Sequence, residues 1–262
     1  MTRWWQDEVF WRDVGRFLFS PAVWASAAEE LDEILELVEA GTGDRILDLG
    51  CGTGRHLLPL IAKGYDVVGV EHCAAFRHLV RRRIQQSEVP LDLRAIDILA
   101  CIEDHIIAAQ TSGQRPSPNA VADALELGEY DAVFDIFALI GYHEAPLVDV
   151  LLVQTILHLL RPGGWLLVQT REPQLTTGTV KHVDGDGGIC VERRRYDRSS
   201  RVMTTQWNLH IDGRQRAHQS FVRVYRQTDL RELLEFAGFR DVSAWSSKAD
   251  ECVTVIGRRA SG

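Results

Sequence analysis

The hydrophobic pattern of the chain is clearest between residues 45 and 71, where two short apolar runs flank a segment with helical spacing. The first run ends on Asp48 and is followed by three glycines, and the second run ends on Glu71. This pattern predicts a β-α-β unit with a flexible turn after its first strand. Because ligands bind at the carboxyl ends of strands in open α/β sheets, the turn and the two acids mark a candidate site.

Further apolar runs predict the rest of an α/β sheet, in which strands and helices follow one another along the chain. We expect strands at residues 91–95, 130–137, 165–169, 241–245 and 252–257, and helices at residues 73–86, 147–160 and 228–236.

From residue 188 onwards the period shortens to two, as in half-buried strands. Residues 189–196, 202–211 and 219–225 alternate in this way, and Asp212-Gly213 favours a tight hairpin turn. The pattern therefore predicts an antiparallel β ribbon at about residues 178–226, inserted after the fifth strand of the sheet.

The first 40 residues carry aromatic and acidic helical patterns. Phe10, Val14 and Phe17 fall on one helical stripe, and a second helix is expected at residues 25–38 with an acidic outer face. The aromatic segment is either a helix packed on the core or a lid over the ligand cleft. We expect residues 41–262 to form the ligand-binding domain.

Residues 98–129 form a second insertion, for which the pattern predicts two helical pieces separated by a breaker rich in serine and proline. A structureless loop of this length would be unusual inside a compact domain, which favours a helical hairpin. The sequence leaves open whether this insertion contacts a second copy of the chain, as in a homodimer, or forms part of a ligand pocket.

Composition narrows the class of protein. The chain has 262 residues, a formal charge of −8 and five cysteines without disulfide-framework or zinc spacing. The negative charge argues against nucleic-acid binding through the phosphate backbone. No apolar run is long enough to cross a membrane, and the start lacks a signal-peptide pattern. We therefore expect a cytoplasmic protein that binds no nucleic acid, membrane or metal.

The glycine-rich turn distinguishes between two kinds of nucleotide site. A dinucleotide fingerprint requires a third glycine at the position that Arg55 occupies, so the NAD pattern fails. The pattern present is Asp48-x-Gly50-x-Gly52-x-Gly54, which resembles motif I of the class I S-adenosylmethionine (SAM) methyltransferases. Glycines let the backbone approach a ligand closely, and a carboxylate can accept hydrogen bonds from ribose hydroxyls.

The resemblance implies a doubly wound, seven-stranded, mostly parallel sheet whose last strand is antiparallel, with SAM at the strand ends. Asp48 and the turn would hold the methionine end of SAM near Arg55, while Glu71 would bind the ribose. His72, Asp97 and Ile98 would surround the adenine. The cofactor-binding residues that we predict are Asp48, Gly50, Cys51, Gly52, Gly54, Arg55, Glu71, His72, Asp97, Ile98 and Asp135.

Methyl transfer from SAM requires mainly positioning and desolvation, and a general base only where the acceptor keeps its proton. His143 follows the fourth strand and is the candidate base, although it is equally suited to begin the next helix. The substrate-binding residues that we predict are Tyr142, Arg171, Trp207 and Arg223.

Two functions are consistent with these features. The first is methyl transfer from SAM to a nitrogen or oxygen atom of a small-molecule metabolite. The second is SAM binding without methyl transfer, as in a cyclase or a regulatory binding module. The acidic balance and the inserted ribbon favour a small acceptor over RNA or DNA.

Overall fold

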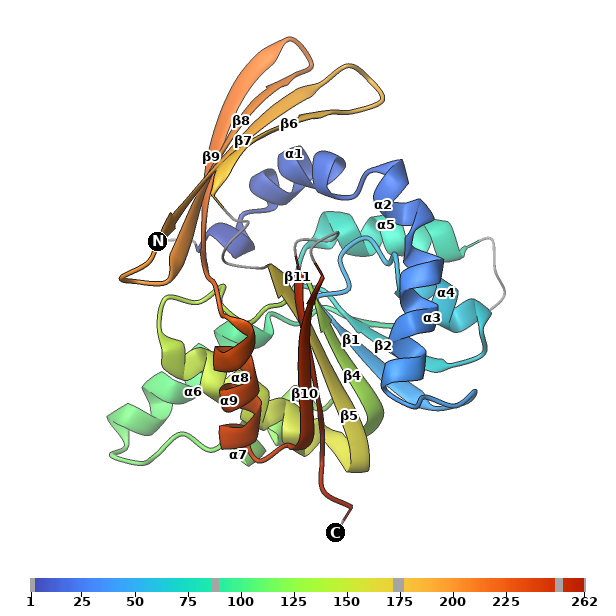
Figure 1. Cartoon of the computed structure of the whole chain (residues 1–262), viewed down its shortest axis with the longest axis vertical. Coiled ribbons are helices and arrows are strands. Elements are labelled where there is room, and N and C mark those ends of the chain that lie inside the picture. Colours follow the sequence, from blue (N-terminus) through green and yellow to red (C-terminus); the bar gives the residue numbers. More distant parts are fainter. Residues whose placement is uncertain (1–2, 86–89, 172–176, 248–251, 262) are drawn as a thin grey trace.

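A computed structural model gives the structure of the chain and describes residues 3–85, 90–171, 177–247 and 252–261. Its centre is a seven-stranded sheet in the order β10-β11-β5-β4-β1-β2-β3 (Figure 1). Neighbouring strands are parallel except for β11, which runs antiparallel to both β5 and β10. The strands are β1 (Arg45–Leu49), β2 (Asp66–Val70), β3 (Asp92–Arg94), β4 (Tyr130–Ile136), β5 (Leu160–Arg171), β10 (Arg240–Ser247) and β11 (Cys252–Arg258). The predicted seven-stranded, mostly parallel sheet with an antiparallel last strand is confirmed.

Helices cover both faces of this sheet. Figure 1 shows α3, α4 and α5 on one face and α6, α7, α8 and α9 on the other. The helices are η1 (Trp4–Gln6, a 3₁₀ turn), α1 (Glu8–Leu18), α2 (Pro21–Ala25), α3 (Ala27–Leu37), α4 (Leu57–Ala62), α5 (Ala74–Ile84), α6 (Ile98–Thr111), α7 (Pro118–Leu125), α8 (Pro146–Leu159) and α9 (Gln227–Ala237). No helix among the described residues is long and apolar enough to cross a membrane.

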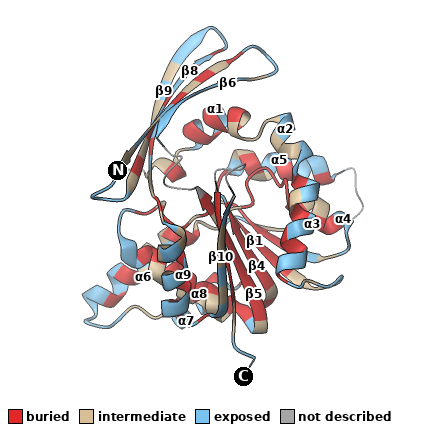
Figure 2. Cartoon of the chain, viewed as in Figure 1, coloured by how far each residue is buried: buried red, intermediate tan, exposed pale blue. Residues whose placement is uncertain are grey.

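The core forms two layers because successive side chains of a strand point to opposite faces. Leu47, Val68 and Val133 pack in the layer under α6 to α9, whereas their neighbours Ile46 and Val67 pack in the layer under α3 to α5. Figure 2 shows the central strands buried along most of their length. This two-sided burial explains why the strands read as continuous apolar runs in the sequence.

The predicted ribbon forms a separate four-stranded antiparallel sheet in the order β6-β7-β8-β9. Its strands are β6 (Gly178–Val183), β7 (Ile189–Asp197), β8 (Val202–Ile211) and β9 (Arg214–Arg223). β7 and β8 match predicted segments, whereas β9 covers residues 214–223 and not the predicted 219–225, and β6 is a further strand that the alternation did not identify. Asp212 and Gly213 both have positive φ in the turn between β8 and β9, as a tight hairpin requires.

The N-terminal region differs in detail from the predicted pair of helices. A short helix that was not predicted, α2, begins at Pro21, where the missing N–H of proline costs nothing. The helix expected at residues 25–38 begins at Ala27. The insertion at residues 98–129 contains the two expected helices, α6 and α7, and Asp97 caps the first of them by accepting a hydrogen bond from Ala100 N.

Candidate active site

A cavity of about 400 Å³ opens at the carboxyl ends of β1, β2 and β4. The strand ends form its floor, and the N-terminal segment from η1 to α2 closes one side. The inner face of the four-stranded sheet supplies residues from all of its strands to the opposite wall. In Figure 1 this small sheet lies beyond α1, away from the central sheet. The cavity is therefore built from a seven-stranded floor and two added walls.

The turn after β1 depends on its glycines. Gly50, Gly52 and Gly54 have φ values of 65°, 55° and 83°, in the left-handed region that side chains disfavour. A β-carbon at Gly52 would lie 3.3 Å from the ring of Phe19, and one at Gly50 would lie 3.2 Å from Leu139. The glycines thus let the backbone of this turn line the cavity at close range.

Glu71 joins this turn to β2. Its buried carboxylate accepts hydrogen bonds from Gly52 N at 3.0 Å and from Cys73 N at 2.7 Å. His72 Nδ1 also lies 3.3 Å from Oε1, so Oε2, whose partner is Gly52 N, keeps a lone pair for a ribose hydroxyl. Glu71, which was predicted to bind the ribose, therefore lines the cavity and can accept a further hydrogen bond.

Two buried acids at the strand ends lack a full set of partners. Asp48 is 3% exposed and Asp135 is fully buried, and one carboxylate oxygen of each has no hydrogen-bond partner among the described residues. Burial raises the pKa of each to about 7, and for Asp48 the nearby Arg55 opposes that rise. Asp48 lines the cavity, whereas Asp135 lies behind it and accepts a hydrogen bond from Leu139 N.

Unpartnered buried carboxylates are costly, which makes the Asp48 oxygen a sign of a cationic ligand. The glycine turn, the orphaned Asp48 oxygen and the Glu71 carboxylate lie on one cavity wall. Together they fit a ligand with an ammonium group and a ribose, as SAM has.

The predicted adenine region is covered by the N-terminal segment. His72, Asp97 and Ile98 all line the cavity, and Gln6 Nε2 donates to Asp97 Oδ2 at 2.9 Å. Burial tends to lower the pKa of His72, but the hydrogen bond and charge of Glu71 outweigh it and raise that pKa. Gln6 was not predicted, because only the fold brings η1 to the start of α6.

Arg55 lines the cavity but already has an ionic partner. Its guanidinium forms two hydrogen bonds to the Glu30 carboxylate, at 2.6 and 3.2 Å, and lies 4.8 Å from the centre of the Phe137 ring. The acidic face of α3, interpreted from the sequence as solvent-exposed, therefore supplies one functional partner. Contact between Arg55 and the methionine carboxylate of SAM stays a prediction.

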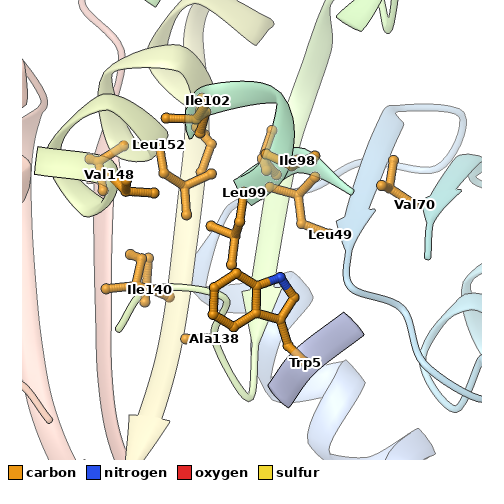
Figure 3. Packing of buried hydrophobic residues seen from close by; sticks show 14 of the residues in the cluster. Trp5, Leu49, Val70, Ile98, Leu99, Ile102, Ala138, Ile140, Val148 and Leu152 are labelled. Atoms are coloured by element: carbon orange, nitrogen blue, oxygen red, sulfur yellow. The ribbon is translucent and has the colours of Figure 1, made fainter. Parts of the chain in front are cut away.

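His143 is buried but is not among the residues that line the cavity. Its Nδ1 accepts a hydrogen bond from Ala145 N at the start of α8, and its Nε2 lies 3.5 Å from Glu103 Oε2. The ring of Trp5, which lines the cavity, has its centre 5.7 Å from that of the His143 ring. Figure 3 shows the Trp5 indole beside Leu99 and Ala138. This position favours the alternative that His143 begins α8, and the role of a base stays an untested prediction.

The predicted substrate-binding residues separate into two groups. Tyr142 and Trp207 line the cavity, the first against Trp4 and the second with its Nε1 donating to Ser220 Oγ at 3.0 Å. Arg223 does not line it, and its guanidinium donates to the carbonyl oxygens of Ser200 and Glu144. The side chain of Arg171 lies outside the described residues.

Two ionisable residues on the four-stranded sheet were missed. His182 and Glu192 line the cavity on β6 and β7, and His182 Nε2 lies 3.0 Å from Glu192 Oε2. The only signal in the sequence is that Glu192 falls in phase with the buried Cys190 of the same strand. Strand alternation gives the face of a residue but not what that face covers.

Comparison with protein families matches residues 21–244 to the family described as "Methyltransferase domain". Among curated proteins, a 23S rRNA (uracil(1939)-C(5))-methyltransferase from Nitrosococcus oceani is 53% identical over 38 residues. This short match spans 14% of the chain and 8% of that protein.

Two solved structures resemble most of the chain. The CcbJ methyltransferase from Streptomyces caelestis has a TM-score of 0.66 at 18% identity, over 90% of each chain. The SAM-bound CalS10, an amino pentose methyltransferase from Micromonospora echinaspora, has a TM-score of 0.63 at 19% identity, over 90% of this chain and 92% of that one. At these identities the likeness concerns the fold.

Proposed function

Because the chain belongs to the methyltransferase domain family and uses SAM as its methyl donor, we propose that it methylates a nitrogen or oxygen atom of a small molecule. The observation that carries the proposal is the cavity itself. It continues from the glycine turn, Asp48 and Glu71 to a wall of the four-stranded sheet. One enclosed space thus offers room for the donor and for an acceptor beside it.

When bound, SAM supplies a methyl group that is already activated on a sulfonium sulfur. The residues of the chain then have three tasks, which are to bind, to orient and to exclude water. Asp48 offers a carboxylate to the ammonium group, and Glu71 offers lone pairs to the ribose. The aromatic residues of η1 and α1 cover the cavity, which supports a lid role for residues 1–40.

Several observations support a small acceptor. The walls formed by α1 and the four-stranded sheet enclose the site, and the formal charge of −8 opposes a polyanionic acceptor. One structural neighbour is an amino pentose methyltransferase, which is consistent with a small acceptor.

Cys51, Cys73 and Cys190 are buried as thiols, which suits the reducing environment of the cytoplasm.

Isothermal titration with SAM and with S-adenosylhomocysteine tests the cofactor part of the proposal. We expect both to bind the wild type and neither to bind Gly52→Arg, since the new side chain would enter the space beside Phe19. Gly43→Arg is the matched control, because Gly43 also has positive φ but no atom lies near its would-be β-carbon. Failure of the wild-type protein to bind either compound would contradict the proposal.

Turnover separates a methyltransferase from a SAM-binding protein without transferase activity. Purified protein is incubated with methyl-labelled SAM and a metabolite extract, and the small-molecule fraction is examined for label. Transfer that Gly52→Arg abolishes supports the proposal. Binding of SAM without any transfer to small molecules supports the non-methylating alternative.

A further inference from the structure

The ionisable groups around the cavity divide by location. Those at the ends of the seven-stranded sheet are Asp48, Glu71, His72 and Asp97, to which the proposed function already assigns SAM binding. We call this part of the cavity the cofactor half and the part along the four-stranded sheet the acceptor half. Arg55 and His56 both face Glu30 of α3, at 2.6 and 3.4 Å. Among the described residues that line the opposite wall, the ionisable pair is His182 and Glu192 of the four-stranded sheet.

This pair has a defined geometry. The Glu192 side chain is 1% exposed, and its Oε2 lies 3.0 Å from His182 Nε2. Arg194 holds the same carboxylate through two hydrogen bonds, at 2.5 and 2.9 Å. A carboxylate held ionised by a guanidinium can only accept hydrogen bonds, so Nε2 of His182 carries the proton. Nδ1 of His182 then keeps its lone pair and can accept a proton from a neighbouring group.

The rest of the wall is mainly apolar and aromatic, and Thr205 and Ser220 add uncharged hydroxyl groups to it. Phe10 and Phe17 of α1 and Trp207 of β8 line it together with Met203 and Val222. Around the whole cavity, the described residues contribute four carboxylates (Asp48, Glu71, Asp97 and Glu192) and the single guanidinium of Arg55, which Glu30 already neutralises. Phosphate recognition requires several available cations or backbone N–H groups. The acceptor half therefore suits a flat apolar molecule and disfavours a phosphorylated one.

We propose that the acceptor is a ring-bearing small molecule without a phosphate group, and that His182, oriented by Glu192, binds its N–H or O–H and takes the proton. The proposal rests on the proposed function and names the class of its acceptor. A lone pair on the acceptor nitrogen or oxygen forms the bond to the methyl carbon. The electrons of the broken sulfur–carbon bond stay on sulfur, and the acceptor's proton passes to Nδ1 of His182.

The test compares His182→Asn and Glu192→Gln with the wild type. His210→Asn is the matched control, because His210 lies on β8 of the same sheet but is exposed. Titration with SAM comes first and should give the same affinity for all four proteins. Glu192 is buried and Glu192→Gln can lose stability, so thermal unfolding is measured for each variant. His182 is 27% exposed at the edge strand, which makes His182→Asn the safer variant.

The probes are 2-naphthol, 4-nitrophenol and a thymidine diphosphate-linked amino sugar, each with labelled SAM. We expect the wild type to methylate the two phenols and not the nucleotide-linked sugar. His182→Asn should lower kcat on 2-naphthol by about 100-fold. At a pH at which 4-nitrophenol is already ionised, the same variant should retain the wild-type rate on that probe, since no proton must be removed. His210→Asn should behave as the wild type.

Three outcomes would overturn this inference while the proposed function stands. They are SAM binding without turnover of either phenol, preference for the nucleotide-linked sugar, and an equal loss of kcat on both phenols in His182→Asn. The last would mean that His182 only positions the acceptor. Failure of the wild type to bind SAM would instead overturn the proposed function itself.

Discussion

The two walls of the cavity are built on different principles. At the ends of β1 and β2 the chain presents backbone groups of a glycine turn and carboxylates at strand ends. On the four-stranded sheet it presents side chains at alternate positions of β6 to β9. Backbone geometry tolerates little variation and leaves a recognisable motif. Alternating side chains leave only a pattern of inward and outward positions.

The buried acids of the two regions differ in how completely protein groups satisfy their carboxylate oxygens. Asp48, at the end of β1, keeps one oxygen without a partner among the described residues, and burial raises its pKa to about 7. In the other region, Asp13 of α1 is bound by Arg216 and His218 of β9 at 2.5 and 3.0 Å. We expect a cationic ligand to complete the first arrangement. The second is complete without one and ties α1 to the four-stranded sheet.

Substitution of Glu71 should have the largest effect, and this effect should be confined to SAM binding at the ends of β1 and β2. In Glu71→Ala we expect SAM affinity to fall at least about 100-fold, since hydrogen bonds to a charged group contribute about 1.5–3 kcal/mol each. Titration calorimetry measures the affinity, and thermal unfolding checks the fold. Glu36→Ala, an exposed acid on α3, is the control and should bind as the wild type. Equal SAM loss in Trp207→Ala would break the division between the two regions.

Substitution of Asp13 tests the second region, the four-stranded sheet with α1, through the stability of the protein. We expect Asp13→Asn to lower the free energy of unfolding by about 2 kcal/mol, because it breaks a buried ionic group whose partners are partly exposed. Burial tends to raise the pKa of Asp13, but Arg216 and His218 outweigh it and lower that pKa below 3.8. The contribution is therefore present above pH 3.8 and is lost as the pH falls through the lowered pKa.

Denaturant unfolding of both proteins at several pH values measures this effect, and the difference between them should shrink in acid. SAM affinity should stay unchanged in Asp13→Asn. A large loss of SAM binding would mean that α1 shapes the cofactor half as well.

The fold and the cofactor half were predictable from particular residues. Asp48, the three glycines and Glu71 lie at fixed positions within one β-α-β unit, so local pattern was sufficient. The acceptor half required knowledge of how distant segments meet. His182 and Glu192 are ten residues apart on two strands, and the contact between Gln6 and Asp97 spans 91 residues. The first contact lies within the paired strands β6 and β7, but whether these residues line the cavity depends on how the four-stranded sheet docks. The second contact depends on how η1 docks, and docking leaves no periodic signal.

The pH dependence of ligand binding should sharpen the role of Asp48. Its pKa of about 7 means that it loses its charge as the pH falls through neutrality. Because a ligand ammonium group favours the ionised carboxylate, affinity for S-adenosylhomocysteine should fall about tenfold between about pH 8 and about pH 6. In Asp48→Asn the affinity should be weaker and nearly independent of pH. Asp135→Asn is the control, since Asp135 titrates in the same range without lining the cavity and should keep the wild-type slope.

His143 lies at the border of the two regions and should give the smallest effect. Burial, together with the nearby Arg3, lowers the pKa of His143, so the ring is neutral near pH 7 and accepts the hydrogen bond from Ala145 N. Since His143 does not line the cavity, we expect His143→Asn to change kcat by less than about twofold and to lower the free energy of unfolding by about 1 kcal/mol. Steady-state rates across pH and thermal unfolding measure both quantities. Loss of the pH-dependent limb of the rate in this variant would restore His143 as the base and would transfer that role away from His182.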